Sequence, residues 1–183
     1  SAALGKLEIA LKNFSKNIHK IEKYYDFSIR QTILNEARDL KLVASNYHNR
    51  AYNNPKLLIY NLKNPMNKLA AKIQLEGGAR IEGVALIKPE QLLGIKIDKV
   101  TQVEKGIIYT KEKGGKQGEV LVSLKTYAEL ENYLSLNSKF KINRQDYYND
   151  IKQAAIISKE VSEGSHGLRW NFAKRRMFEY GKA

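Results

Sequence analysis

Residues 95–123, IKIDKVTQVEKGIIYTKEKGGKQGEVLVS, contain four short runs that are rich in β-branched residues. The runs are residues 95–97, 100–103, 107–110 and 120–123. Polar or glycine-containing stretches separate them, and such an alternation predicts a small antiparallel sheet. The last separating stretch is Lys113-Gly114-Gly115-Lys116, so we expect the last hairpin to have a basic, glycine-rich tip.

Helices are predicted before this sheet. Over residues 1–25, apolar residues recur every three or four positions, which indicates one apolar helix face. Ser28 and Gln31 form a capping-box pattern that predicts the start of a second amphipathic helix. Its expected buried side consists of Ile29, Ile33, Ala37, Leu40, Ala44 and Tyr47. Two such helices cannot bury both apolar faces alone, so they need a further helix, the rest of the chain or another subunit.

Further helix boundaries lie on either side of the sheet. Asn54-Pro55 and Asn64-Pro65 each place a capping residue before a proline, which predicts two short helices, the second ending at Gly77-Gly78. After the sheet, we expect helices near Thr126 (with Glu129 as its capping partner), over residues 143–161, and from Ser165. The order of helices, a small sheet and helices predicts a mostly helical α+β fold.

The polar, Asn-rich residues 46–55 are the candidate linker of the chain. The expected domains are therefore an N-terminal helical domain, residues 1–50, and a second domain, residues 51–183.

Composition excludes several classes of function. The 183 residues include no cysteine, so a disulfide scaffold, a thiolate zinc site and a catalytic cysteine are excluded. No apolar run approaches the ~20 residues that would span a bilayer. The formal net charge is +13, spread over both halves of the chain, which favours a polyanionic partner: nucleic acid first, an anionic membrane surface second.

Three segments carry residues suited to phosphate chemistry: Arg80 after Gly77-Gly78, Lys113 or Lys116 on the hairpin tip, and His166 with Arg169 at a helix start. Taken singly, they are a solvated helix end, an exposed hairpin and a capping or salt-bridge pair. Together they could converge on one phosphate, since arginines bind nonbridging oxygens and a lysine or histidine can transfer a proton. No Asp/Glu metal cluster is evident, so we expect no metal and no cofactor.

The order of these segments resembles the tyrosine recombinase (phage integrase) family over about residues 50–183. Residues 75–81, LEGGARI, resemble its first arginine box, and residues 110–116, TKEKGGK, resemble its hairpin lysine segment. Residues 165–173, SHGLRWNFA, resemble its His-x-x-Arg box and are the most specific of the three.

The resemblance implies a role for each residue. Arg80 and Arg169 would bind the scissile phosphate, and His166 would donate a hydrogen bond or carry a proton. Lys113 would protonate the leaving 5′ oxygen, with Lys116 as the alternative. The family usually has an acidic residue three positions after the first arginine, where this chain has Gly83, with Glu82 one position earlier.

Lys116, Lys174, Arg175 and Arg176 are the candidate DNA-binding residues. The resemblance also implies double-stranded DNA as partner, self-association into a synaptic tetramer, and a cytoplasmic, DNA-associated protein of a bacterium, phage or mobile element. Residues 1–50 would be part of the core-binding domain.

The family's nucleophilic tyrosine lies some tens of residues beyond the His-x-x-Arg box. Tyr180 is the only tyrosine after the box here, and its position on the same helix favours a packing residue. We therefore expect a recombinase cut short, inactive by itself. Two alternatives stay open: a non-catalytic architectural or regulatory DNA-binding protein with the same fold, and an RNA-binding module that uses some of the 11 tyrosines for stacking.

Overall fold

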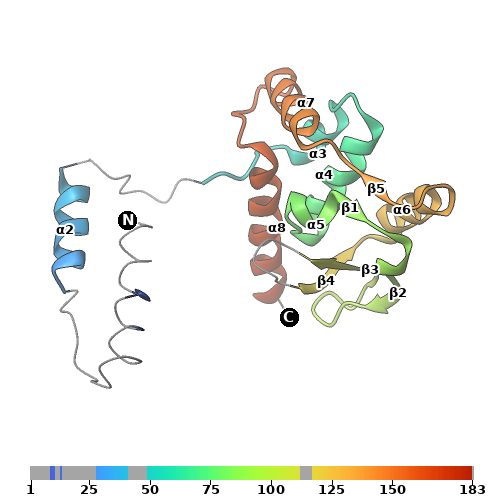
Figure 1. The fold of residues 1–183 in the computed structure, drawn as a ribbon, viewed down its shortest axis with the longest axis horizontal. Coiled ribbons are helices and arrows are strands. Elements are labelled where there is room, and N and C mark those ends of the chain that lie inside the picture. The colour runs from blue at the N-terminus through green and yellow to red at the C-terminus, as the bar shows by residue number, and fades with distance from the viewer. Residues whose placement is uncertain (1–8, 11–12, 14–27, 41–48, 112–116, 183) are drawn as a thin grey trace. The chain divides into compact units, whose positions relative to one another are not determined.

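The computed structural model describes residues 9–10, 13, 28–40, 49–111 and 117–182. The chain divides into two compact units, residues 1–48 and residues 49–183 (Figure 1). The predicted helix over residues 1–25 lies almost entirely outside the described residues. No helix in the described ranges is long and apolar enough to cross a membrane.

The first unit contains helix α2, Ser28–Asp39, which begins where the sequence predicted. Two residues of its expected buried side are exposed: Ile33 by 49% and Leu40 by 69%. The prediction of burial is wrong for these two, because no described residue covers them.

In the second unit, two helices begin at the predicted Asn-Pro pairs. The side chain of Asn54 accepts a hydrogen bond from Leu57 N and caps α3, Pro55–Tyr60. The side chain of Asn64 likewise accepts one from Met66 N and caps α4, Pro65–Gly77. A short helix, α5, Ile81–Val84, follows α4 directly.

A three-stranded antiparallel sheet follows, in the order β2-β3-β4. Its strands are β2 Leu92–Ile97, β3 Glu104–Lys111 and β4 Gln117–Val122. The β3–β4 hairpin pairs Gly106 with Val122 and Lys111 with Gln117 at its two described ends. A separate two-stranded sheet, which the sequence did not predict, pairs β1, Leu86–Ile87, with β5, Phe140–Lys141; a 3-10 turn, Pro89–Gln91, lies between β1 and β2.

The strand predicted at residues 100–103 is wrong, because these residues form the turn between β2 and β3. The Asp98 carboxylate accepts hydrogen bonds from Val100 N (3.2 Å) and Thr101 Oγ1 (2.9 Å), which folds the chain back. Gln102 then adopts a positive φ of 55°. Local side-chain bonds of this kind outweigh the β propensity of two valines.

Three longer helices complete the unit: α6 Leu124–Leu136, α7 Arg144–Ile157 and α8 Gly164–Tyr180. Ser123 caps α6 through Thr126 N, three residues before the predicted start at Thr126. Glu129, the predicted capping partner of Thr126, accepts from Lys72 Nζ instead. Asn143 caps α7. In Figure 1, α8 (red) runs along one side of the unit, from α7 to the sheet.

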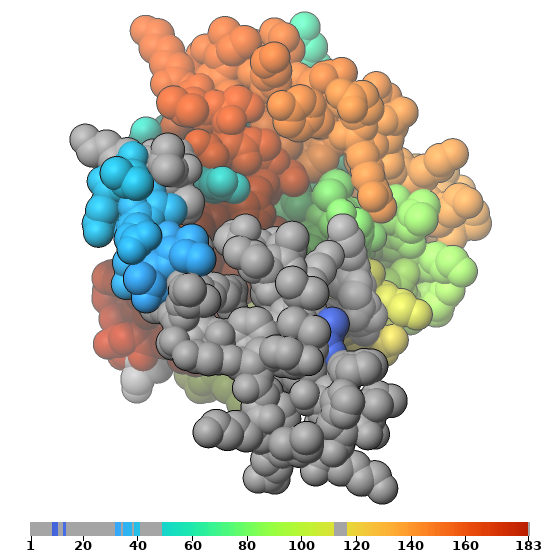
Figure 2. Space-filling model, turned by 60° about the vertical axis from the view of Figure 1, so that its left-hand side comes forward, coloured from blue at the N-terminus to red at the C-terminus, as the bar shows by residue number. Residues whose placement is uncertain are grey.

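The core of the second unit lies between its helices and the inner face of the sheet. Its largest fully buried side chains are Tyr147, Phe140, Leu58, Leu62, Ile73, Ile87, Ile108, Leu130, Ile151 and Leu168. Figure 2 shows α7 and the segment that leads into α8 (orange) on the surface of this unit. The α+β architecture, mostly helical with small antiparallel sheets, is the predicted one.

Candidate functional site

Arg80 lies in the short connection between α4 and α5. The chain leaves α4 at Gly78, whose φ of 71° is in the left-handed region, and the N–H of Gly78 donates to Gln74 O. Glycine adopts this conformation without the steric cost that a Cβ brings. Arg80 then occupies the N-cap position of α5, and its side chain is half-buried.

Two glycines let neighbouring elements pack directly on this connection. A Cβ at Gly77 would lie 2.0 Å from Val120 Cγ1 of β4, and a Cβ at Gly78 would lie 2.3 Å from the Phe172 ring of α8. Strand β4 follows the predicted lysine tip, and α8 carries His166 and Arg169. The two glycines therefore bring the end of α4 into direct contact with β4 and with α8.

A buried polar chain holds the backbone just before Arg80. Tyr147 Oη donates to Gln74 Oε1 (2.7 Å), and Gln74 Nε2 donates to Ala79 O (3.1 Å). All three residues are at most 1% exposed. Burial raises the pKa of Tyr147 well above its ordinary value, so the phenol stays protonated and remains a donor.

Arg169 is bonded to the same connection. Its Nε donates to Gly78 O at 2.7 Å, which joins α8 to the end of α4 two residues before Arg80. The Arg169 side chain is half-buried. This bond uses one of the N–H donors of the planar guanidinium. It therefore also fixes the direction in which the remaining donors point.

His166 lies one helical turn before Arg169 on α8, at the surface. Its pKa is lowered from its ordinary value, first by partial burial and then by the positive charges of Arg169, Arg50 and Arg80. Three arginines from distant parts of the sequence therefore act on one imidazole. Because the lowered pKa favours the neutral ring at pH 7, His166 can accept a proton as well as donate a hydrogen bond.

The described part of the predicted linker is residues 49–55, and Tyr52 within it is bonded to α8. Tyr52 N donates to Asn171 Oδ1 (3.0 Å), and Asn171 Nδ2 donates back to Tyr52 O (2.8 Å). Tyr52 Oη donates to Gly164 O (2.9 Å) and accepts from Glu163 N (3.1 Å). Burial raises the pKa of Tyr52 to about 12. The prediction of a linker is therefore wrong for residues 49–54.

The close contact of this segment with α8 requires a third glycine. A Cβ at Gly167 would lie 2.5 Å from the Tyr52 ring and 2.8 Å from Arg50 O. The Glu160 carboxylate, just before α8, accepts hydrogen bonds from Asn53 N and Asn54 N. The roles of Tyr52 and Arg50 were not predicted from the sequence; the one local signal of a close neighbour is the glycine inside the His-x-x-Arg box.

Lys113 and Lys116 lie outside the described residues. The last described pair of the hairpin is Lys111 with Gln117, at the ends of β3 and β4. Glu82, the acid after Arg80, lies 4.0 Å from Arg144 Nη1 in a partly exposed ion pair, and Gly83 is buried in α5.

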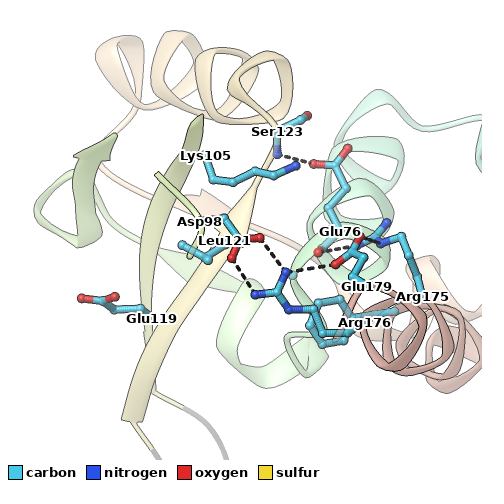
Figure 3. Close-up of a pocket in the computed structure, with 11 residues that line it drawn as sticks. Glu76, Asp98, Lys105, Glu119, Leu121, Ser123, Arg175, Arg176 and Glu179 are labelled. Carbon is cyan, nitrogen blue, oxygen red and sulfur yellow. Dashed lines mark hydrogen bonds and ion pairs between the residues drawn. The ribbon is translucent and has the colours of Figure 1, made fainter. Parts of the chain in front are cut away.

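The three basic residues after Arg169 differ in their surroundings. Lys174 is exposed. Arg175, also exposed, donates to Glu76 O (2.7 Å). Arg176 donates from Nη1 and Nη2 to the Asp98 carboxylate at 2.5 and 2.7 Å, beside a cavity of about 400 Å³ between α8 and the sheet (Figure 3). Arg176 is therefore occupied within the protein.

The sequence predicted that Tyr180 is a packing residue, and its side chain lies outside the core, 62% exposed. The guanidinium of Arg176 lies 5.1 Å from the centre of its ring. Within the described ranges, no group of three or more His, Asp or Glu side chains could hold a metal ion.

No family model and no curated protein matches the sequence. Two solved structures of the XerH site-specific recombinase are similar in fold. A pre-cleavage complex with its difH substrate matches 98% of this chain and 53% of its own, with a TM-score of 0.57 and 16% identity. A post-cleavage complex with palindromic difH matches 77% and 48%, with a TM-score of 0.55 and 17% identity. The chain spans about half the length of these proteins, and it has the fold of the tyrosine recombinases.

Proposed function

We propose that this chain is a DNA-binding part of a site-specific tyrosine recombinase, and that Arg80, Arg169 and His166 bind the scissile phosphate. One observation carries the proposal: Arg169 is bonded to Gly78 O, on the connection that presents Arg80, while Arg80, Arg169 and Arg50 all act electrostatically on His166. Such a concentration of positive charge around an exposed imidazole fits a phosphate that gains negative charge during the reaction.

The proposed reaction is a transesterification that needs no net hydrolysis. A tyrosine hydroxyl attacks the DNA phosphorus, forms a 3′-phosphotyrosyl bond and releases the 5′ oxygen. Arg80 and Arg169 bind the nonbridging oxygens, and neutral His166 accepts the tyrosine proton or donates a hydrogen bond. Lys113, or Lys116 in its place, donates the proton to the 5′ oxygen. A 5′ hydroxyl of the partner strand then attacks the same phosphorus and releases the tyrosine.

In this proposal the second unit is the catalytic domain, and the first unit belongs to the core-binding domain. Duplex DNA is the substrate, and subunits assemble in a tetramer on two sites. Lys174 and Arg175 contribute exposed positive charge toward DNA. Arg176, which is paired with Asp98, serves instead to hold α8 against the turn between β2 and β3.

The proposal is tested on a duplex selected by this chain from a random library. The selected duplex, nicked near its centre, is incubated with the chain and with the longest protein that its gene encodes, and denaturing gels are searched for a covalent adduct. We expect an adduct with the longer protein and none with this chain alone. Arg169→Ala in the longer protein should reduce the adduct at least a hundredfold, the range for loss of a transition-state donor. DNA binding should stay within about tenfold, because one of many phosphate contacts is lost.

Two further variants accompany the test: Arg169→Lys separates the charge from the guanidinium shape, and Lys152→Ala is the control for a change of surface charge. Arg169→Lys keeps the charge without the guanidinium fork, so it should also lose the adduct; Lys152→Ala, on the exposed surface of α7, should change neither binding nor adduct. Tight, salt-sensitive duplex binding without any adduct would favour the non-catalytic DNA-binding protein. Preference for single-stranded RNA would refute both.

A further inference from the structure

A second basic surface lies outside the site of Arg80, His166 and Arg169. It is a groove of about 580 Å³ in the second unit, formed by α3, α4, the start of α6 and one residue of α8. Five cationic side chains line it: Lys56, Lys68, Lys72, Lys125 and Arg175. Glu76 is the one carboxylate among the lining residues.

The carboxylates in and beside this groove are already engaged. Glu76 Oε2 accepts from Ser123 N (2.7 Å), and its Oε1 accepts from Thr126 Oγ1 (3.0 Å), so this carboxylate serves the start of α6. Glu129 binds Lys72 Nζ with both oxygens, at 2.8 and 2.6 Å. These bonds neutralise Lys72 but leave the other lysines of the groove uncompensated.

Lys56, Lys68 and Lys125 form no ion pair with any carboxylate of the described residues. Lys56 and Lys125 are exposed, and Lys68 lies 5.6 Å from the centre of the Tyr60 ring, which is itself exposed by 75%. Unpaired lysines on one concave surface repel one another, so a bound anion would lower their electrostatic energy.

The groove extends along α4 toward the candidate site. Lys68, Lys72 and Glu76 follow one another at intervals of one turn along α4, so the row is about 12 Å long at 1.5 Å per residue. This row of side chains runs toward the Gly78–Arg80 connection at the end of the same helix. One strand of B-DNA presents a phosphate about every 3.4 Å of axis, so this length spans about three phosphates.

From this groove we infer a second DNA-binding surface, at which Lys56, Lys68 and Lys125 contact the phosphate backbone of a duplex away from the scissile phosphate. The inference rests on the proposed function for the identity of its ligand. The ends of these lysines are flexible and bear no base-reading geometry, so the contact contributes affinity independent of sequence.

The test compares two triple variants of equal charge in the full chain. One replaces Lys56, Lys68 and Lys125 by glutamine, and the control replaces the exposed Lys139, Lys141 and Lys152, which do not line the groove. Binding of a labelled 30-base-pair duplex is measured by fluorescence anisotropy between 50 and 300 mM salt. Each lost phosphate contact should lower the salt slope by about 0.9, which is about eightfold in affinity at 0.1 M salt.

We expect the groove variant to lose two to three units of slope and at least about fiftyfold in affinity, and the control to lose less than threefold. Equal losses in the two variants would refute the groove while leaving DNA binding intact. Absence of duplex binding by the unmodified chain would instead refute the proposed function. Equal competition by polyglutamate of the same charge, or a loss seen only with single strands, would refute a duplex backbone as the ligand.

Discussion

Replacing Asp98 by asparagine would test whether the Asp98–Arg176 pair holds α8 on the sheet. Asp98 is 3% exposed, and its carboxylate accepts four hydrogen bonds, two from Arg176 and one each from Val100 N and Thr101 Oγ1. Asparagine has the same shape, but one of the two oxygens becomes an NH₂ group. That group cannot accept, so it opposes a guanidinium donor.

The expected loss of stability is about 2–4 kcal/mol. Removing one partner of a fully buried ion pair typically costs about 3–5 kcal/mol. The Arg176 side chain is 21% exposed and keeps Glu179 Oε2 at 3.0 Å, so the cost should lie toward the lower end. With a urea m-value of about 2 kcal/mol/M, the midpoint should move by roughly 1–2 M.

Urea unfolding followed by the fluorescence of Trp170 measures this loss, since Trp170 is the single tryptophan and lies on α8 with Arg176. Arg176 lowers the pKa of Asp98 well below its ordinary range. A lowered pKa gives stability that is present above the unfolded value, about 3.9, and is lost as the pH falls through the native value. The difference between wild type and variant should therefore be constant from pH 5 to 8 and shrink below about pH 4.

Glu119→Gln is the matched control, because it removes an ion pair with Lys96 whose side chains are 46% and 44% exposed. An exposed pair contributes less than about 1 kcal/mol. If Asp98→Asn destabilises the protein no more than Glu119→Gln does, or if its effect is unchanged at pH 3, the pair does not hold α8 in place.

Three further predictions concern the side chains around the candidate site. Tyr147→Phe should cost about 1–3 kcal/mol, since it leaves Gln74 Oε1 buried without its donor; thermal unfolding measures the loss, and a change below 0.5 kcal/mol would contradict the buried chain. Burial raises the pKa of both Tyr147 and Tyr52, so ultraviolet titration should show late ionisation of Tyr147 and, at about pH 12, of Tyr52. Its contribution to stability should be complete below pH 10 and lost as the pH rises through about 12. His166 should titrate by NMR below its ordinary pKa of about 6.5, and Arg169→Gln should raise that pKa; an unchanged value would contradict a cationic site.

Local signals in the sequence predicted much of the fold. Several helix boundaries depend only on neighbouring residues and can therefore be predicted without tertiary contacts. They are the two Asn-Pro helix starts, the Gly77-Gly78 helix end and the start of the His-x-x-Arg helix. The same holds for strands β3 and β4. The two-residue pairing of β1 with β5 was missed, because Leu86-Ile87 and Phe140-Lys141 are too short to show a period.

The candidate site could be named from the sequence, but the contacts that support it could not. Arg80, His166 and Arg169 could be named from their residue types and spacing. Their supporting contacts join residues that are far apart in the sequence, such as Gln74 with Tyr147 and Tyr52 with Asn171. No short-range pattern marks such pairs. The valines at positions 100 and 103 favoured a strand, and only the turn formed by Asp98 shows why they are not in one.

The contacts of Gly77, Gly78 and Gly167 affect how a mutational map of this protein should be interpreted. Each position is closed to any side chain by a neighbour within 2.5 Å of where Cβ would lie. In a saturation screen all three would score as intolerant as the proposed phosphate-binding residues, although glycine has no side chain that could take part in the chemistry. Intolerance near Arg80 and Arg169 therefore reports the close packing of Val120, Phe172 and Tyr52 on these glycines as well as any role in catalysis.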